Sequence, residues 1–194
     1  MYKTVFDTPI IKPFLQPIAR SLFKLNGWKI VDRSTGSKKY ILIGAPHTSN
    51  WDFPMFLLIM MELNLKAYWL GKHTLFNWPF GALFHWLGGL PVDRTRSTNI
   101  VQQCVDYFAA EDALIIANTP EGTRSRVDRW KTGFYHIATG AGIPIALGYL
   151  DYRKKEGGIA GLFQPTGDID ADMKTIKAFY RNVSGKHSHR YDKT

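Results

Sequence analysis

Apolar and polar positions alternate along this chain in blocks that predict strands and helices in turn. Short apolar runs bounded by turn residues predict strands at residues 66–70, 91–92, 113–118, 144–151 and 158–164, with the last two pairing as a hairpin. Apolar residues that recur at helical spacing predict helices at residues 18–25, 52–63, 79–87, 97–110, 133–139 and 171–183. Residues 28–31 and 39–44 alternate like strands across a polar turn and predict a second hairpin.

Strands that alternate with helices favour a mainly parallel central sheet, and the two hairpin signals add antiparallel pairing. A chain of 194 residues is long enough to bury one sizeable core, and we find no internal repeat or linker. We therefore predict an α/β fold, a single-domain sandwich with a mixed, mainly parallel central sheet flanked by helices. We place this domain at residues 28–183.

The two ends of the chain differ from this pattern. Residues 1–27 predict an amphipathic segment that starts late because of three prolines and has Arg20 and Lys24 opposite its apolar positions. Residues 1–31 carry five Lys or Arg against one Asp, a net charge of +4. Such a helix either rests on anionic lipid with its apolar side inserted or packs on its own domain. Residues 184–194 predict a disordered basic tail.

The overall net charge of +9 indicates an anionic partner, which is a nucleic acid, an acidic lipid or a phosphorylated substrate. The chain is 14% aromatic with six Trp, and such residues favour boundaries between apolar and wet surroundings, including a membrane surface. No apolar run reaches the length of about 18 residues that crosses a bilayer, and Lys12, Arg20 and Lys24 interrupt any secretion signal. The single Cys104 excludes an internal disulfide and fits a reducing compartment. We expect a cytoplasmic location.

A histidine and a carboxylate five residues apart, His47 and Asp52, lie where a buried strand should end and a helix begin. A carboxylate on one ring nitrogen holds the tautomer of an imidazole, and the other nitrogen can then take a proton from a hydroxyl. The alternative is that Asp52 caps the helix beside an incidental loop histidine. Ser49 is a rival nucleophile, but no Gly-x-Ser-x-Gly elbow surrounds it and a hydrogen bond at the helix start is favoured.

Further motifs follow the His47 motif in a fixed order. They are the stretch from Gly89 to Arg94, the block from Glu121 to Ser125, the adjoining Lys131-Thr132-Gly133, and the strand-like run from Ile143 to Leu147. In its order and spacing of blocks the chain resembles the lysophosphatidic acid acyltransferase family of glycerolipid acyltransferases, over about residues 40–150. The resemblance implies an α/β architecture in which these blocks converge at one edge of the sheet.

The resemblance also implies a reaction. An O-acyltransferase of this kind moves a fatty acyl chain from an acyl thioester, acyl-CoA or acyl carrier protein, to the hydroxyl of a lysophospholipid such as 1-acyl-glycerol-3-phosphate. His47 is then the general base and Asp52 its orienting partner. Direct transfer needs no covalent enzyme intermediate, no cofactor and no metal. We expect the protein on the cytoplasmic face of a membrane with an anionic surface.

Six residues of the blocks are implied in substrate binding, and they are Arg94, Glu121, Gly122, Thr123, Arg124 and Lys131. Arg94 and Arg124 are assigned to the acceptor's phosphate, because guanidinium donors match phosphate oxygens bidentately. Glu121 is expected to fix an arginine or a substrate hydroxyl. Gly122 permits a close approach of the backbone, Thr123 can donate to phosphate, and Lys131 adds positive charge to the same cleft.

Two other functions stay open at this point. Hydrolysis of a thioester or ester would use the same His47 with water in place of the acceptor. Nucleic-acid binding would account for the charge and the aromatic residues, but no recognised motif supports it and the basic residues are scattered. The remaining histidines show no metal-ligand spacing, so we predict no metal site.

Overall fold

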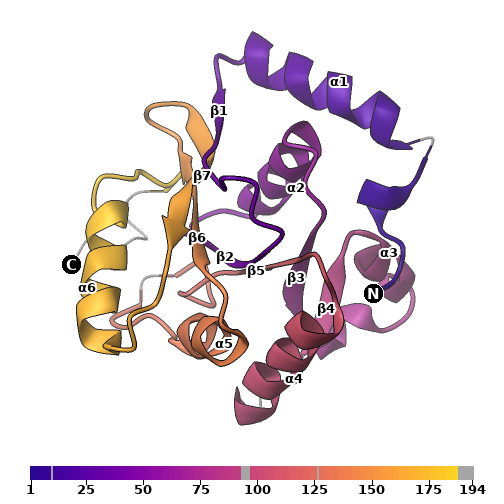
Figure 1. Ribbon diagram of the computed structural model, residues 1–194. Coiled ribbons are helices and arrows are strands. Elements are labelled where there is room, and N and C mark those ends of the chain that lie inside the picture. The colour runs from indigo at the N-terminus through magenta and orange to yellow at the C-terminus, as the bar shows by residue number, and fades with distance from the viewer. Residues whose placement is uncertain (10, 93–96, 126, 188–194) are drawn as a thin grey trace.

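Seven strands form one sheet at the centre of the computed structural model, which describes residues 1–9, 11–92, 97–125 and 127–187 (Figure 1). The strands are β1 (Lys29–Asp32), β2 (Lys39–Gly44), β3 (Ala67–Lys72), β4 (Gly89–Val92), β5 (Leu114–Asn118), β6 (Ile145–Asp151) and β7 (Glu156–Phe163). Their order is β1-β7-β6-β2-β5-β3-β4, and all neighbours pair in parallel except β6 and β7. This confirms the predicted α/β fold with a mixed, mainly parallel sheet.

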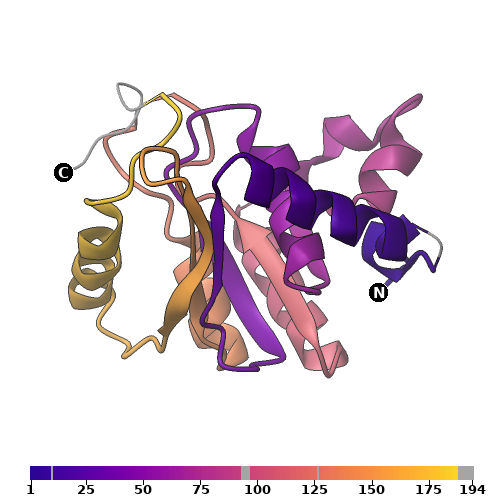
Figure 2. The same ribbon diagram turned by 90° about the horizontal axis from the view of Figure 1, so that it is seen from above.

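Helices cover both faces of the sheet. They are α1 (Ile11–Leu25), α2 (Asp52–Glu62), α3 (Gly81–Trp86), α4 (Ser97–Ala110), α5 (Gly133–Ala141) and α6 (Ile169–Tyr180), with two 3-10 helices, η1 (Val5–Asp7) and η2 (His73–Phe76). Buried residues of α4, α5 and α6 form one hydrophobic cluster with the sheet, and those of α1 and α2 form another. Figure 2 shows α6 on one side of the sheet, with α1 and α2 on the other.

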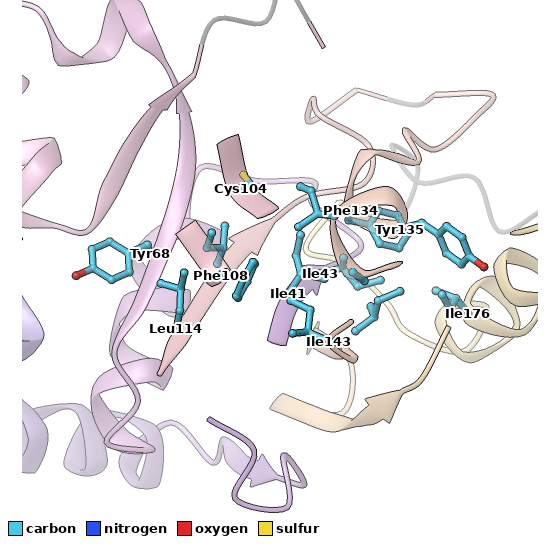
Figure 3. Close-up of a cluster of buried hydrophobic side chains, with 14 of the residues drawn as sticks. Ile41, Ile43, Tyr68, Cys104, Phe108, Leu114, Phe134, Tyr135, Ile143 and Ile176 are labelled. Carbon is cyan, nitrogen blue, oxygen red and sulfur yellow. The ribbon is translucent and has the colours of Figure 1, made fainter. Parts of the chain in front are cut away.

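The central strand β2 explains why two clusters exist. Ile41 and Ile43 belong to the cluster of α4, α5 and α6, whereas Tyr40 and Leu42 belong to that of α1 and α2. Figure 3 shows Ile41 and Ile43 among the side chains of the first cluster. Because successive side chains of a strand point to opposite faces, a strand buried on both faces reads as a continuous apolar run. That run is what the sequence shows from residue 40 to residue 43.

The hairpin predicted from residues 28–31 and 39–44 is wrong. β1 pairs in parallel with β7, with Lys29 opposite Glu156, and it lies at the edge of the sheet. β2 lies between β5 and β6. The residues at both ends of β1 are exposed, as suits an edge, whereas β2 is buried along most of its length. Alternation therefore identified both strands but carried no information about their partners. The other hairpin, β6 with β7, is confirmed.

Helix α1 begins at Ile11, earlier than the predicted residue 18. Pro13 lies in its first turn, where backbone N–H groups have no partner within the helix, and its missing N–H costs little there. Ala19 and Phe23 are buried on the side that faces the domain, and the Arg20 guanidinium donates to Glu62 of α2 over 2.9 Å. Among the helices of the described residues, none combines the length and the apolarity needed to span a membrane.

Candidate active site

Two loops that follow neighbouring parallel strands meet at one edge of the sheet. Residues 45–51 follow β2 and contain His47, and residues 119–125 follow β5 and contain Glu121. β2 and β5 pair in parallel, with Ile43 opposite Asn118, so both strands end at the same edge. Ligand sites of α/β proteins lie at the carboxyl ends of strands, and this edge is therefore the first place to look for one.

His47 and Asp52 contact each other directly. The His47 Nδ1 atom lies 3.1 Å from Asp52 Oδ2, and Asp52, the first residue of α2, is only 6% exposed. The same Oδ2 accepts the backbone N–H groups of Thr48 and Ser49, each at 2.9 Å, so the carboxylate also holds the loop before the helix. The alternative in which Asp52 merely caps α2 beside an incidental histidine does not describe this arrangement.

The charge on Asp52 fixes the tautomer of His47. Burial raises the pKa of Asp52, but hydrogen bonds from His47, the Ser49 N–H and the Tyr152 hydroxyl outweigh it and leave that pKa below its ordinary value. An ionised carboxylate only accepts hydrogen bonds, so Nδ1 of His47 carries the proton. Its Nε2 atom is then left with a lone pair, as a general base requires.

Glu121 joins the two loops in a way that the sequence did not predict. Its Oε2 atom accepts the backbone N–H of His47 over 3.0 Å, and its Oε1 atom is buried without a hydrogen-bond partner among the described residues. Burial raises the pKa of Glu121 to about 7; repulsion from Asp52 adds to this, and the His47 N–H opposes it. Glu121 thus positions the loop of residues 45–51 through the backbone, whereas its predicted role toward an arginine or a substrate hydroxyl stays a prediction.

A cavity of about 580 Å³ lies between α2 and the sheet, and His47, Asp52 and Arg124 are among its lining residues. Most of its wall is apolar and includes Leu42, Phe53, Phe56, Met60, Trp69 and Leu150. Polar groups line it near the two loops, among them Asn50, Thr119 and Thr123. The cavity therefore joins a polar site at the edge of the sheet to an apolar space beneath α2.

The structure brings most of the predicted binding residues to this edge. Gly122, Thr123 and Arg124 line the cavity, and Gly122 adopts a φ of 66°, which glycine tolerates best. The Lys131 ammonium lies beside Gly122, since a Cβ atom added there would be 3.1 Å from Lys131 Nζ. Arg94, the other predicted phosphate ligand, lies outside the described residues.

Ser49 has the role that the sequence favoured for it. Its side chain is buried, and its hydroxyl oxygen accepts the backbone N–H of Trp51 over 3.2 Å. The hydrogen bond lies just before the start of α2, and serine commonly makes such a bond to the backbone at the start of a helix.

Two parts of the site gave no signal in the sequence. The hydroxyl of Tyr152, in the turn between β6 and β7, donates to Asp52 Oδ1 over 2.8 Å. Residues 184–187, which we predicted as the start of a disordered tail, instead contact the loop of residues 45–51. The His187 N–H donates to the Thr48 hydroxyl over 3.2 Å, and the Lys186 ammonium lies 5.1 Å from the centre of the Trp51 ring.

Comparison with known proteins places this chain, with its α/β fold and its His47–Asp52 pair, among the acyltransferases. A family model described as Acyltransferase matches residues 28–146, more than half of the chain. The chain therefore belongs to this acyltransferase family, within the glycerolipid acyltransferase superfamily.

Individual relatives can be named. The 1-acyl-sn-glycerol-3-phosphate acyltransferase of Haemophilus influenzae is 31% identical over 134 residues, which are 64% of this chain and 54% of the relative. The Escherichia coli protein of the same name is 34% identical over 119 residues, 58% of this chain and 46% of the relative. The chain thus spans about half the length of the curated relatives that it matches.

A solved structure shares the fold. The crystal structure of the 1-acyl-sn-glycerophosphate acyltransferase PlsC from Thermotoga maritima aligns with a TM-score of 0.57 over 87% of this chain and 76% of that one, at 15% identity. At that identity the likeness concerns the architecture alone.

The raised pKa of Glu121 makes a prediction about stability. Its pKa rises from 4.5 to about 7 on folding, so its contribution to stability is fully present below pH 4.5 and is lost as pH rises through 7. Glu121→Gln keeps an acceptor for the His47 N–H and does not titrate. The free energy of unfolding of the parent should therefore fall relative to the variant by up to about 3 kcal/mol between pH 4.5 and 8. Urea unfolding at several pH values measures this, and a difference that is constant with pH contradicts it.

Proposed function

We propose that this chain is an O-acyltransferase that moves a fatty acyl group from an acyl thioester, acyl-CoA or acyl carrier protein, to the hydroxyl of a lysophospholipid such as 1-acyl-glycerol-3-phosphate. The observation that carries the proposal is the 3.1 Å contact of His47 Nδ1 with Asp52 at the polar end of an apolar cavity. The names of its curated relatives, 1-acyl-sn-glycerol-3-phosphate acyltransferases, support the choice of acceptor.

In this reaction His47 Nε2 takes the proton of the acceptor hydroxyl as that oxygen attacks the thioester carbonyl. The C–O bond forms, the C–S bond breaks, and the departing thiolate receives the proton from the imidazolium. Asp52 stabilises the imidazolium while the proton is on Nε2. The donor is already activated, so alignment of the two substrates and removal of one proton suffice, and no cofactor takes part.

The apolar part of the cavity suits the fatty acyl chain. The volume of the whole cavity, about 580 Å³, lies within the range of roughly 300–1,000 Å³ that is usual for pockets enclosing small ligands. Each methylene group moved from water to such a wall gains about 0.8 kcal/mol. A long acyl chain beneath α2 would therefore hold the thioester carbonyl near His47. Both donor types present the same acylated thiol, and the walls of this cavity do not distinguish between them.

The acceptor's phosphate fits the polar rim. Arg124 lines the same cavity as His47, and Lys131 lies beside Gly122 on the same loop. A guanidinium can bind a phosphate through two parallel hydrogen bonds, whereas an ammonium adds a point charge. We assign the phosphate to Arg124, with Lys131 adding to the positive field.

A second apolar surface, separate from the cavity, lies on α1. Phe14, Ile18, Leu22 and Leu25 are 68%, 50%, 44% and 84% exposed, while Ala19 and Phe23 of the same helix are buried. One face of α1 thus packs on the domain, as one of the two alternatives given by the sequence has it, and the other faces outward. An exposed apolar stripe on a basic helix fits the interface of an anionic membrane.

We place the protein peripherally on the cytoplasmic face of a membrane, and the exposed apolar side chains of α1 support this position. The segment that includes η2 and α3 adds Leu75, Trp78, Phe80 and Leu83, which are 43%, 93%, 61% and 47% exposed. Leu75 also lines the cavity, so this segment reaches from the outer surface to the acyl site. The free, buried Cys104 fits the reducing side of the membrane.

His47→Ala should lower acyl transfer at least about 100-fold, because it removes the general base. Asp52→Asn should lower it less, since the amide keeps some of the hydrogen bonds of the carboxylate. His136→Ala, on the exposed surface of α5, is the control and should resemble the parent. The assay follows a labelled acyl thioester in the presence of a lysophospholipid. Near-normal transfer by a folded His47→Ala protein contradicts the mechanism, and rapid release of free fatty acid without acceptor indicates the hydrolase alternative.

Arg124→Ala should raise the Michaelis constant for the lysophospholipid by about 10- to 150-fold, because a charge-assisted hydrogen bond is worth about 1.5–3 kcal/mol. The constant for the acyl donor should change little. Arg181→Ala, at the end of α6 and away from the cavity, is the control. If Arg124→Ala changes only the Michaelis constant for the acyl donor, the phosphate is bound elsewhere.

Leu22→Ser combined with Leu25→Ser should lower binding to anionic vesicles by at least about tenfold, because the variant lacks two apolar side chains that insert into the lipid interface. Acylation of a dispersed short-chain lysophospholipid should persist, since neither residue lines the cavity. Ala178→Ser, exposed on α6, serves as the control. Sedimentation with vesicles measures the partition, and a double variant that sediments like the parent excludes this face of α1 as the membrane contact.

A further inference from the structure

Asp52 receives a hydrogen bond from a part of the chain that no motif includes. Tyr152 lies between β6 and β7, and its hydroxyl donates to Asp52 Oδ1 over 2.8 Å. The other oxygen, Oδ2, accepts from His47 and from the backbone of residues 48 and 49. Tyr152 also lies beyond residues 28–146, the part of the chain that the family model matches.

Contacts with two other segments and within its own turn hold Tyr152 in place. Its backbone N–H donates to the Ser184 carbonyl over 2.9 Å. Its ring packs edge to face against Trp28, with the ring centres 5.2 Å apart. The turn itself is fixed by the buried Asp151 carboxylate, which accepts the backbone N–H groups of Arg153 and Lys154 at 3.1 and 3.0 Å. A hydroxyl on so constrained a side chain has little freedom to leave Asp52.

The hydrogen bonds of Asp52 come from both sides of the carboxylate. A carboxylate has about four acceptor positions, and His47, two backbone N–H groups and Tyr152 supply four donors. Without the donor on Oδ1, rotation of the carboxylate would move Oδ2 away from His47 at less cost. The Tyr152 hydroxyl therefore opposes this rotation.

We propose that Tyr152 is a positioning residue of the acyltransferase site, whose hydroxyl holds the Asp52 carboxylate so that Oδ2 stays on His47 Nδ1. This inference rests on the proposed role of His47 as the general base. Tyr152 acts through Asp52, and it does not line the cavity that receives the substrates.

The charges around Asp52 give this role a measurable consequence. The titratable groups that face it are His47, Tyr152 and Glu121. Burial and the bond to Asp52 raise the pKa of Tyr152, so its hydroxyl remains a donor at neutral pH. That bond is one of the contributions that keep the pKa of Asp52 low. When the hydroxyl is removed, the Asp52 carboxylate becomes more basic and stabilises the protonated form of the general base His47 more strongly. A proton then blocks the base at a higher pH, and activity on the acid side is lost sooner.

The test compares Tyr152→Phe with a matched control. In the proposed arrangement kcat falls roughly tenfold while both Michaelis constants change less than about twofold, because only the alignment of His47 is disturbed. The acid limb of the pH profile of kcat moves to higher pH. Tyr135→Phe loses a tyrosine–carboxylate hydrogen bond of the same 2.8 Å length, to Asp172 of α6. It should lower stability and leave the acid limb in place.

A second measurement does not depend on activity. The proton between His47 Nδ1 and Asp52 should give a downfield NMR resonance, which should shift in Tyr152→Phe and remain unchanged in Tyr135→Phe. Should Tyr152→Phe fail to fold, 3-fluorotyrosine at position 152 keeps the ring and strengthens the donor, so the acid limb should move to lower pH.

An active parent whose folded Tyr152→Phe variant keeps kcat, the acid limb and the resonance overturns the inference. An unchanged acid limb with fluorotyrosine overturns it too. A parent that shows no acyl transfer overturns the proposed function instead, while the resonance still decides whether Tyr152 positions the pair.

Discussion

The hydrogen bonds to one buried carboxylate, that of Asp52, hold the candidate site together. An ionised carboxylate in a protein interior is costly unless its oxygens are bonded to donors. Here the donors come from the histidine ring, the loop before α2 and the turn between β6 and β7. Each donor gains a strong bond only if its segment stays in place. The need to satisfy Asp52 therefore fixes the position of His47 relative to the sheet.

Glu121 is a second buried carboxyl group, but burial raises its pKa instead of leaving it ionised like Asp52. Two carboxylates close together cannot both ionise easily, and their surroundings separate their pKa values. Asp52 has several donors and keeps its charge, whereas Glu121 has one backbone donor and a pKa near 7. The negative charge beside His47 is thereby concentrated on Asp52. Glu121 serves as the link between the loops after β2 and β5.

The sequence predicted those features that depend on neighbouring residues. The apolar run before His47 predicted a strand, and the residues from Asp52 predicted α2. That the loops after β2 and β5 meet was not read from neighbouring residues but was implied by the family resemblance. The partner of β1 was not predictable, since alternation shows only which side chains face inward. Tyr152 was missed for the same reason. It lies 100 residues from Asp52, and only the folded sheet brings the two together.

The two differently exposed faces of α1 connect the fold to the proposed lipid substrate. A helix that buried all its apolar residues would leave the domain with a polar exterior on this side. Instead Ala19 and Phe23 are buried against the domain, with Ile11 and Leu15 packed beside them, and Phe14 and Leu25 remain outside. Such exposure is unfavourable in water and becomes favourable only against an apolar phase. The apolar cavity beneath α2 offers an acyl chain a similar environment. A lipid that leaves the bilayer for the site would therefore exchange one apolar surrounding for another, and only its polar end would meet His47 and Arg124.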